Sequence, residues 1–411
     1  MKKIEFPTFY AAPIFLAVAL KSGVDAFFEV NVVKYLYFFL LIFGVFFMRT
    51  GRAFDRQLQG RGVNNLQSVL WVYVMLYFTF LVMLMMWQNG SPQMIFKIVS
   101  PFIFFGLLVA ARDKSLPFAL ALGAALNILA NAALLPFDFG WTYWGGVSTF
   151  KGFYMFKTDL SYSLATSVLI YAAWNRYKPT PTLLILTLVS VGMVVLANSR
   201  ANYLTMLIVL AFIAYKNGAR PAVLAGYAAF LGVVVALVMF LYDPSKYLGF
   251  DTSDMGSLTQ GRDRILEVLI RYGLATYGPL ELLFGRGLYA DLLIYMENVS
   301  DGVPHGAHND VMYQLTTQGI FGLAMNFCGW YLVWRIANSD GRRQWASGLA
   351  FVAFLMYLVQ GMTMTVSVFA LKTWPLASVL LLILVSPDDP DGKVADASLP
   401  PKAKPFSLWG N

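Results

Sequence analysis

Apolar runs of membrane-spanning length recur along nearly the whole chain, and they limit its fold more than any other feature. A transmembrane helix needs roughly 20 mainly apolar residues, and it pairs its own backbone groups where no water is present. The candidate spans are 7–20, 32–48, 66–87, 94–111, 115–135, 159–174, 181–198, 201–215, 221–242, 319–337, 345–363 and 366–385. We therefore expect an all-α integral membrane protein with about twelve transmembrane helices.

The composition agrees with a membrane location. The 411 residues are 58% hydrophobic and only 13% charged, whereas soluble domains carry about 25% charged residues. One buried core cannot account for this, because the apolar runs are spread along the chain. The single cysteine, Cys328, excludes an intramolecular disulfide and any cysteine-based metal cluster.

The positions of lysine and arginine predict the orientation in the membrane, because cytoplasmic loops carry an excess of both. With both termini inside, every inner segment holds at least two basic residues, and more than half of the chain's 30 lie inside. The inner residues are Lys2, Lys3, Arg49, Arg52, Arg56, Arg61, Arg112, Lys114, Arg176, Lys178, Lys216, Arg220, Arg335, Arg342, Arg343, Lys393, Lys402 and Lys404. This topology explains the net charge of +8, so we expect no nucleic acid partner.

The chain divides into four parts on this basis. Residues 1–242 hold nine predicted spans, residues 243–318 form a large outer segment with short helices, residues 319–385 hold three more spans, and the polar tail 386–411 is predicted to be disordered and cytoplasmic. A second outer segment, 136–158, is rich in glycine and aromatic residues. It is typical either of an aromatic belt at the headgroups or of a sugar-facing loop.

Both histidines lie at the end of the large outer segment. On one unbroken helix, His308, Met312, Leu315, Gly319 and Gly322 would share a face, so that another helix or a lipid chain could approach the glycines below the imidazole. His308 is a candidate general base, since histidine changes charge near neutral pH. The alternative is that it caps the following helix. His305 and Asn309 are possible supporting residues, and we expect His305 to be a loop residue.

Arginines near the outer surface are candidate anion ligands. Arg200 follows Asn198-Ser199 at the start of a span, where a helix N-terminus and a guanidinium together favour a phosphate. The alternative for Arg200 is snorkelling to lipid headgroups. Arg262, Arg264 and Arg286 lie in the large outer segment, where two or more could converge on a diphosphate, and Arg262 opens a predicted helix.

Several common catalytic motifs are missing from the sequence. Asp389-Pro-Asp391, in the tail, is the only Asp-x-Asp pair, and there is no P-loop, HExxH or GxSxG motif. We therefore expect chemistry without a metal, a cofactor or ATP, in which the substrate is already activated, as in a sugar on a lipid diphosphate.

These residues resemble the O-antigen ligase family, part of a larger group with O-antigen polymerases and bacterial protein O-oligosaccharyltransferases. The family pattern is His, then Asn, Ser or Gln, nine residues, Gly, two residues, and Gly, Thr or Tyr. The matching residues are His308-Asn309 and Gly319-Ile-Phe-Gly322, with weaker agreement at Asn198-Ser199-Arg200-Ala201, Gly261-Arg262 and Leu283-Phe284-Gly285-Arg286-Gly287. The resemblance covers about residues 185–335.

The resemblance implies a multi-pass enzyme of the bacterial inner membrane whose active site faces the periplasm. It would transfer O-antigen from undecaprenyl diphosphate to lipid A-core, completing lipopolysaccharide, with membrane lipids around it. His308 would be the general base, and Arg200 and Arg262 would bind the diphosphate. The alternatives are an O-antigen polymerase, a protein O-oligosaccharyltransferase or, with less support, a transporter of polyprenyl-linked lipid.

Overall fold

The computed structural model describes residues 61–88, 92–111, 116–144, 147–218, 262–299, 306–337 and 348–362. Eleven α-helices are described there, and 81% of that part is helical. The expected spans 7–20, 32–48, 221–242 and 366–385 and the tail 386–411 lie outside it, as does His305.

Each of the other eight expected spans overlaps a described helix. The helices are α4 (Arg61–Gln88), α5 (Pro92–Ala111), α6 (Leu116–Ala132), α7 (Lys157–Trp174), α8 (Pro181–Ala197), α9 (Arg200–Lys216), α16 (Asp310–Ala337) and α17 (Leu349–Gly361). Among the described helices, α4 alone is long and apolar enough to cross a membrane, over Ser68–Trp87. Shorter apolar stretches are Leu120–Ala132, Pro181–Ala197, Ala201–Lys216 and Leu349–Gly361.

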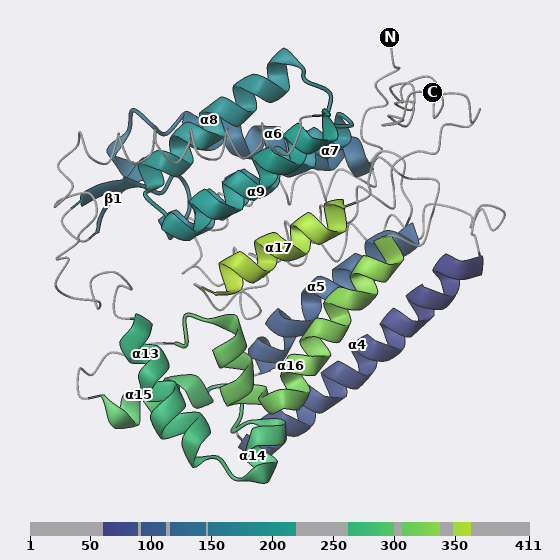
Figure 1. The fold of residues 1–411 in the computed structure, drawn as a ribbon, viewed down its shortest axis with the longest axis vertical. Helices are drawn as coiled ribbons and strands as arrows, with labels where there is room; N and C mark the ends of the chain where they lie inside the picture. The colour runs from purple at the N-terminus through teal and green to yellow at the C-terminus, as the bar shows by residue number, and fades with distance from the viewer. Residues whose placement is uncertain are drawn as a thin grey trace, which may run out of the picture.

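Two groups of helices share the molecule (Figure 1). Helices α6, α8 and α9 surround α7, while α5 and α16 pack beside α4. Helix α7 is buried from Leu160 to Ala173 except at Tyr171, and many of its residues are Ser, Thr or Ala. Small residues allow helix backbones to approach closely inside a membrane. Helix α17 contacts both α9 and α16 and so connects the two groups.

Residues 136–158 contain a β-hairpin, which the prediction of an all-α fold missed. Strands β1 (Trp141–Trp144) and β2 (Val147–Phe150) pair antiparallel after a short 3-10 helix, η2 (Asp138–Gly140). Alternating aromatic and β-branched residues favour strands, and Trp141 packs edge-on against Phe150 at 5.3 Å between ring centroids. The sequence signal was present in Trp141–Trp144, and we interpreted it only as composition.

The large outer segment folds into short helices beside α16 (Figure 1). They are α13 (Arg262–Val268), the π-helix η3 (Leu269–Gly273), the 3-10 helix η4 (Leu274–Thr276), α14 (Pro279–Phe284) and α15 (Ala290–Asn298). Helices α14 and α15 both contact α16, and α13 contacts α15. The candidate residues of this segment therefore lie on elements that pack either against α16 or against its neighbour α15.

Candidate functional site

His308 lies in a tight turn immediately before α16. Its φ is +46°, a left-handed conformation that few non-glycine residues adopt. Asn309, rather than His308, caps the helix: its side-chain oxygen accepts a hydrogen bond of 3.0 Å from the Met312 N–H. The Asn309 side-chain amide also donates to the Met362 carbonyl at 3.3 Å. The turn is therefore fixed on one side to the end of α17.

Asp291 holds the same turn from the other side. This residue of α15 is only 3% exposed, and its Oδ2 accepts a hydrogen bond of 3.0 Å from the Ala307 N–H. Burial raises the pKa of Asp291 to about 6, and hydrogen bonds from the backbone at Ala307, Leu292 and Asp291 itself oppose that shift. Asp291 could not be identified from the sequence, because the short helix around it carries no motif and its partner is 16 residues away.

Helix α16 breaks at Gly319, so the prediction of one unbroken helical face from His308 to Gly322 is wrong. Gly319 has φ +67° and ψ −168°, which are not helical values. A Cβ at Gly319 would lie 2.4 Å from the Leu283 carbonyl carbon, and one at Gly322 would lie 2.1 Å from the Cβ of Gln318. Only glycine fits at the break, because the backbone at the end of α14 passes directly against it.

At the break in α16, two backbone segments cross in close contact. Gly319 lies on one segment, and Gly285, in the turn after α14, lies on the other. A Cβ at Gly285, whose φ is +76°, would lie 2.3 Å from the backbone of Gln318. The N–H groups of Arg286 and Gly287 donate to the carbonyls of Thr316 and Thr317 at 3.0 and 3.1 Å. Carbonyls left without helical partners near the break are satisfied in this way. The Leu283–Gly287 turn and the glycine of the histidine motif are thus parts of one junction.

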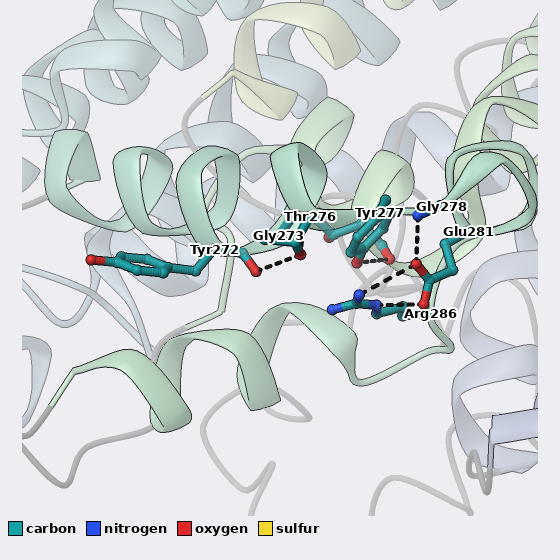
Figure 2. Close-up of polar contacts among 8 residues, drawn as sticks. Tyr272, Gly273, Thr276, Tyr277, Gly278, Glu281 and Arg286 are labelled. Atoms are coloured by element: carbon teal, nitrogen blue, oxygen red, sulfur yellow. Dashed lines mark hydrogen bonds and ion pairs between the residues drawn. The ribbon is translucent and has the colours of Figure 1, made fainter.

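Arg286 is paired within its own turn (Figure 2). Its Nε donates to Glu281 Oε1 at 2.8 Å, and its guanidinium carbon lies 4.5 Å from the centroid of the Tyr277 ring. Glu281 also accepts from the Gly278 N–H at 2.8 Å, and the Tyr277 hydroxyl donates to the Thr316 carbonyl at 2.8 Å. The Arg286 side chain is 35% exposed. Its charge is balanced locally by Glu281, a pairing that the sequence did not predict.

A buried polar cluster surrounds the first turns of α16. The Tyr357 hydroxyl donates to Asp310 Oδ2, and the Asn326 amide donates to that hydroxyl at 2.6 Å. Gln314 donates to Asp310 Oδ2 at 3.1 Å. Further along, the Tyr77 hydroxyl donates to Gln318 Oε1 at 2.8 Å. These residues connect α16 to α4 and α17 just beyond His308, and hydropathy alone did not distinguish them.

The other candidate arginines lie at helix starts. Arg200 is the first residue of α9 and follows Asn198, which ends α8 in a left-handed conformation. Helices α9 and α17 run in opposite directions, since Gly348 before α17 lies against Phe212 near the end of α9. The end of α17, which holds the His308 turn, therefore points toward the start of α9.

Helix α13 carries the two remaining arginines, Arg262 and Arg264. Arg262 is half-buried at its first position, while Arg264 is exposed. The helix packs against α15, the helix of Asp291. Arg262, Arg286 and the His308 turn therefore lie on elements that pack against one another or against a shared neighbour. Arg200 lies at the start of α9, toward which the end of α17 points.

Residues 184–327 match a family model described as O-antigen ligase. The chain carries a domain of the O-antigen ligase family. No curated protein matches the chain.

The O-antigen ligase domain extends from α8 into α16, past the break at Gly319. It therefore contains the α8–α9 turn, the short helices and the His308 turn described above. The members of this family are membrane enzymes of glycosyl transfer, and the family implies an integral membrane location and polyprenyl-linked glycan substrates.

Proposed function

We propose that this protein is an O-antigen ligase of the bacterial inner membrane. It transfers O-antigen from undecaprenyl diphosphate to lipid A-core at the periplasmic surface. The observation that carries the proposal is the His308 turn: a half-buried imidazole precedes α16 within the O-antigen ligase domain, and Asp291 and Asn309 fix the backbone on both sides of it. Such a turn is suited to a general base, which must be held at a defined position.

The proposed topology has about twelve transmembrane helices with both termini in the cytoplasm. The distribution of lysine and arginine supports it, because every inner segment then holds at least two basic residues. In this orientation, the Trp87 end of α4 and the start of α9 face the periplasm. The active site then lies on the side where both lipid-linked substrates would meet.

The arginines are proposed to bind the donor diphosphate. Arg200 at the start of α9 combines a guanidinium with a helix N-terminus, and Arg262 opens α13. Both features favour a phosphate. Arg264 and Arg286 would contribute less, because Arg264 is exposed and Arg286 is already paired with Glu281. Neutralising the developing charge makes the lipid diphosphate a better leaving group.

His308 is proposed to accept the proton of the acceptor hydroxyl. As that oxygen attacks the anomeric carbon, the bond from this carbon to the diphosphate oxygen breaks on the opposite face. A single displacement of this kind inverts the anomeric configuration. The donor is already activated, so the proposed reaction needs neither a nucleotide nor a metal.

An O-antigen polymerase or a protein O-oligosaccharyltransferase would use a similar donor with a different acceptor. The experiment that separates these functions is a gel of lipopolysaccharide from cells lacking the protein. Loss of a ligase leaves lipid-linked O-antigen in the membrane and unsubstituted lipid A-core. Loss of a polymerase leaves single repeats on the core, and this outcome would overturn the ligase proposal. Unchanged lipopolysaccharide with lost protein glycosylation would indicate the third function.

A further inference from the structure

Helix α14 exposes several apolar side chains although it lies outside the predicted spans. Leu280, Leu282 and Leu283 are 63%, 40% and 42% exposed. The one polar side chain of the helix, Glu281, is engaged by Arg286 and by the Gly278 N–H. The surface that α14 presents is therefore almost entirely aliphatic.

The end of α14 lies beside α4 at a point well inside the membrane-length span. The rings of Phe284 and Phe80 are 6.3 Å apart, and Phe321 lies 5.9 Å from Phe284 and 4.8 Å from Phe80. Phe80 precedes Trp87, the last residue of the span, by seven residues. At a rise of 1.5 Å per residue, the aromatic contact lies about 10 Å inside that end of the span.

The outward surfaces of α4 and α16 at this depth are also apolar. Leu76 and Met83 of α4 are 61% and 66% exposed, and Ile320, just past the break in α16, is 56% exposed. Large apolar patches are unfavourable in water, whereas the same side chains are suited to a hydrocarbon environment. The aliphatic surface of α14 continues the surface that α4 presents as a candidate membrane span.

The backbone of the turn after α14 is compatible with a medium that contains no water. Non-helical backbone is tolerated at membrane depth only where the protein satisfies its polar groups. The N–H groups of Gly285, Arg286 and Gly287 all donate to protein carbonyls, at 2.6, 3.0 and 3.1 Å. The one cation of the turn, Arg286, has Glu281 and the Tyr277 ring as partners, and ionisable groups inside a membrane require such partners.

We propose that α14 and the Gly285 turn lie within the bilayer at the Trp87 end of α4, where Leu280, Leu282 and Leu283 contact lipid acyl chains. Part of the large outer segment then re-enters the membrane below the His308 turn. This inference depends on α4 crossing a membrane, and it is independent of the reaction that the protein catalyses.

Site-directed spin labels in liposomes test the proposal, and the single native cysteine makes the labelling selective. In a Cys328→Ser background, we would label Leu280→Cys and Leu283→Cys, with Met83→Cys on α4 as the lipid-facing control and Arg264→Cys on α13 as the aqueous control. Electron paramagnetic resonance then compares collisions with oxygen, which concentrates in lipid, and with a water-soluble nickel chelate. We expect both α14 labels to resemble Met83→Cys. Labels as accessible to nickel as Arg264→Cys overturn the proposal, and so do labels shielded from both reagents, since protein would then cover α14.

A second measurement needs no substitution. A photoactivatable carbene reagent dissolved in the acyl chains would be irradiated with the wild-type protein, and labelled peptides would be mapped. We expect label on residues 279–284 as well as on α4. Label on α4 without label on α14 overturns the proposal even if the cysteine variants fold poorly.

Discussion

Two buried polar clusters in this protein both contain tyrosine and asparagine side chains, and they differ in how completely their polar atoms are hydrogen-bonded. Between α6 and α7, the Asn127 amide donates to Ser163 and Ser167, and the Tyr154 hydroxyl donates to Asn127 and Ser163. All of these side-chain polar atoms have partners.

The cluster around the start of α16 leaves some of its polar atoms unsatisfied. Gln314 Oε1 and Gln318 Nε2 are buried and have no hydrogen-bond partner. This cluster also borders the break at Gly319 and the left-handed His308. A satisfied cluster rigidifies a fold, whereas unsatisfied groups and backbone strain concentrate at functional sites. The first cluster therefore has the character of a scaffold, and the second has the character of a site.

The largest effect should come from His308→Ala. Loss of a positioned general base lowers the rate by roughly 10²–10⁴. We expect this loss in the transfer rate at equal membrane abundance, with donor binding unchanged. His305→Ala is the control and should cost much less. If His308→Ala retains more than about a tenth of the wild-type rate, the general-base role is wrong.

The second largest loss of transfer rate should come from the two arginines at helix starts, Arg200 and Arg262. We expect Arg200→Ala and Arg262→Ala to lower transfer by about 10²–10³, the range for removing one group that stabilises developing charge. Arg200→Lys should restore only part of the rate, because lysine lacks the planar fork. The control is Arg271→Ala, since Arg271 is an exposed residue whose contacts, 4.0 Å to Glu267 and 5.8 Å to the centroid of the Tyr272 ring, are with its near neighbours in the sequence. If an alanine variant keeps the wild-type rate, that arginine does not bind the donor diphosphate.

Gly319→Ala should destabilise the protein by roughly 3 kcal/mol or more, because a positive φ strains alanine and its Cβ collides with the backbone of Leu283. The matched control is Gly192→Ala in α8, where a Cβ would meet nothing within 4 Å. That change should stabilise the protein by up to about 1 kcal/mol, from helix propensity. The measurement is thermal unfolding in detergent, and equal unfolding temperatures for the two variants would contradict the backbone crossing.

Asp291→Asn should reveal a pH dependence. The pKa of Asp291 is raised from 3.8 to about 6 in the folded protein, so protonation favours folding. The protonated carboxyl contributes its full stabilisation of the fold below the unfolded pKa, and this stabilisation is lost as the pH rises through about 6. At pH 8 the asparagine variant should be more stable than the wild type by up to about 3 kcal/mol, since each pKa unit corresponds to about 1.4 kcal/mol.

The difference between the wild type and Asp291→Asn should disappear near pH 4, and chemical denaturation across this range measures it. Asparagine keeps an acceptor for the Ala307 N–H, so transfer by this variant should persist. Asp291→Ala removes that acceptor, and transfer should fall although His308 is intact. A stability difference that does not change with pH would refute the buried, titrating carboxyl.

The smallest expected effects are the stability losses of two tyrosine variants, one in each buried polar cluster. Tyr154→Phe leaves Asn127 and Ser163 with each other as partners, so we expect a loss of about 1 kcal/mol in stability. Tyr77→Phe removes the donor to Gln318 Oε1 and leaves both ends of a buried amide unpaired, which should cost about 1–3 kcal/mol. Equal losses of stability would mean that the polar atoms of the two clusters are hydrogen-bonded to the same extent.

The candidate site was only partly predictable from its sequence. The spacing from His308 to Gly319 indicated a special glycine, and the turn Asn198-Ser199 indicated the start of α9. The predicted boundaries of α8 and α9 agree with the structure within a few residues, whereas α16 begins at Asp310, nine residues before the predicted start at Gly319. The conformation of Gly319 was not predictable, because the opposing backbone comes from Leu283–Gly285, more than 30 residues earlier in the chain.

Local sequence was sufficient for the features that depend on local physics. Apolar runs of a given length favour helices in a membrane, and Thr180-Pro181 and Asn198 set the ends of α8 through capping and a left-handed turn. The hairpin at Trp141–Phe150 was also encoded locally, although we expected a loop there. Tertiary structure alone determined which elements hold the His308 turn. Asp291 and Met362 are far from His308 in the sequence, and a single hydrogen bond between distant residues leaves no periodic signal in either segment.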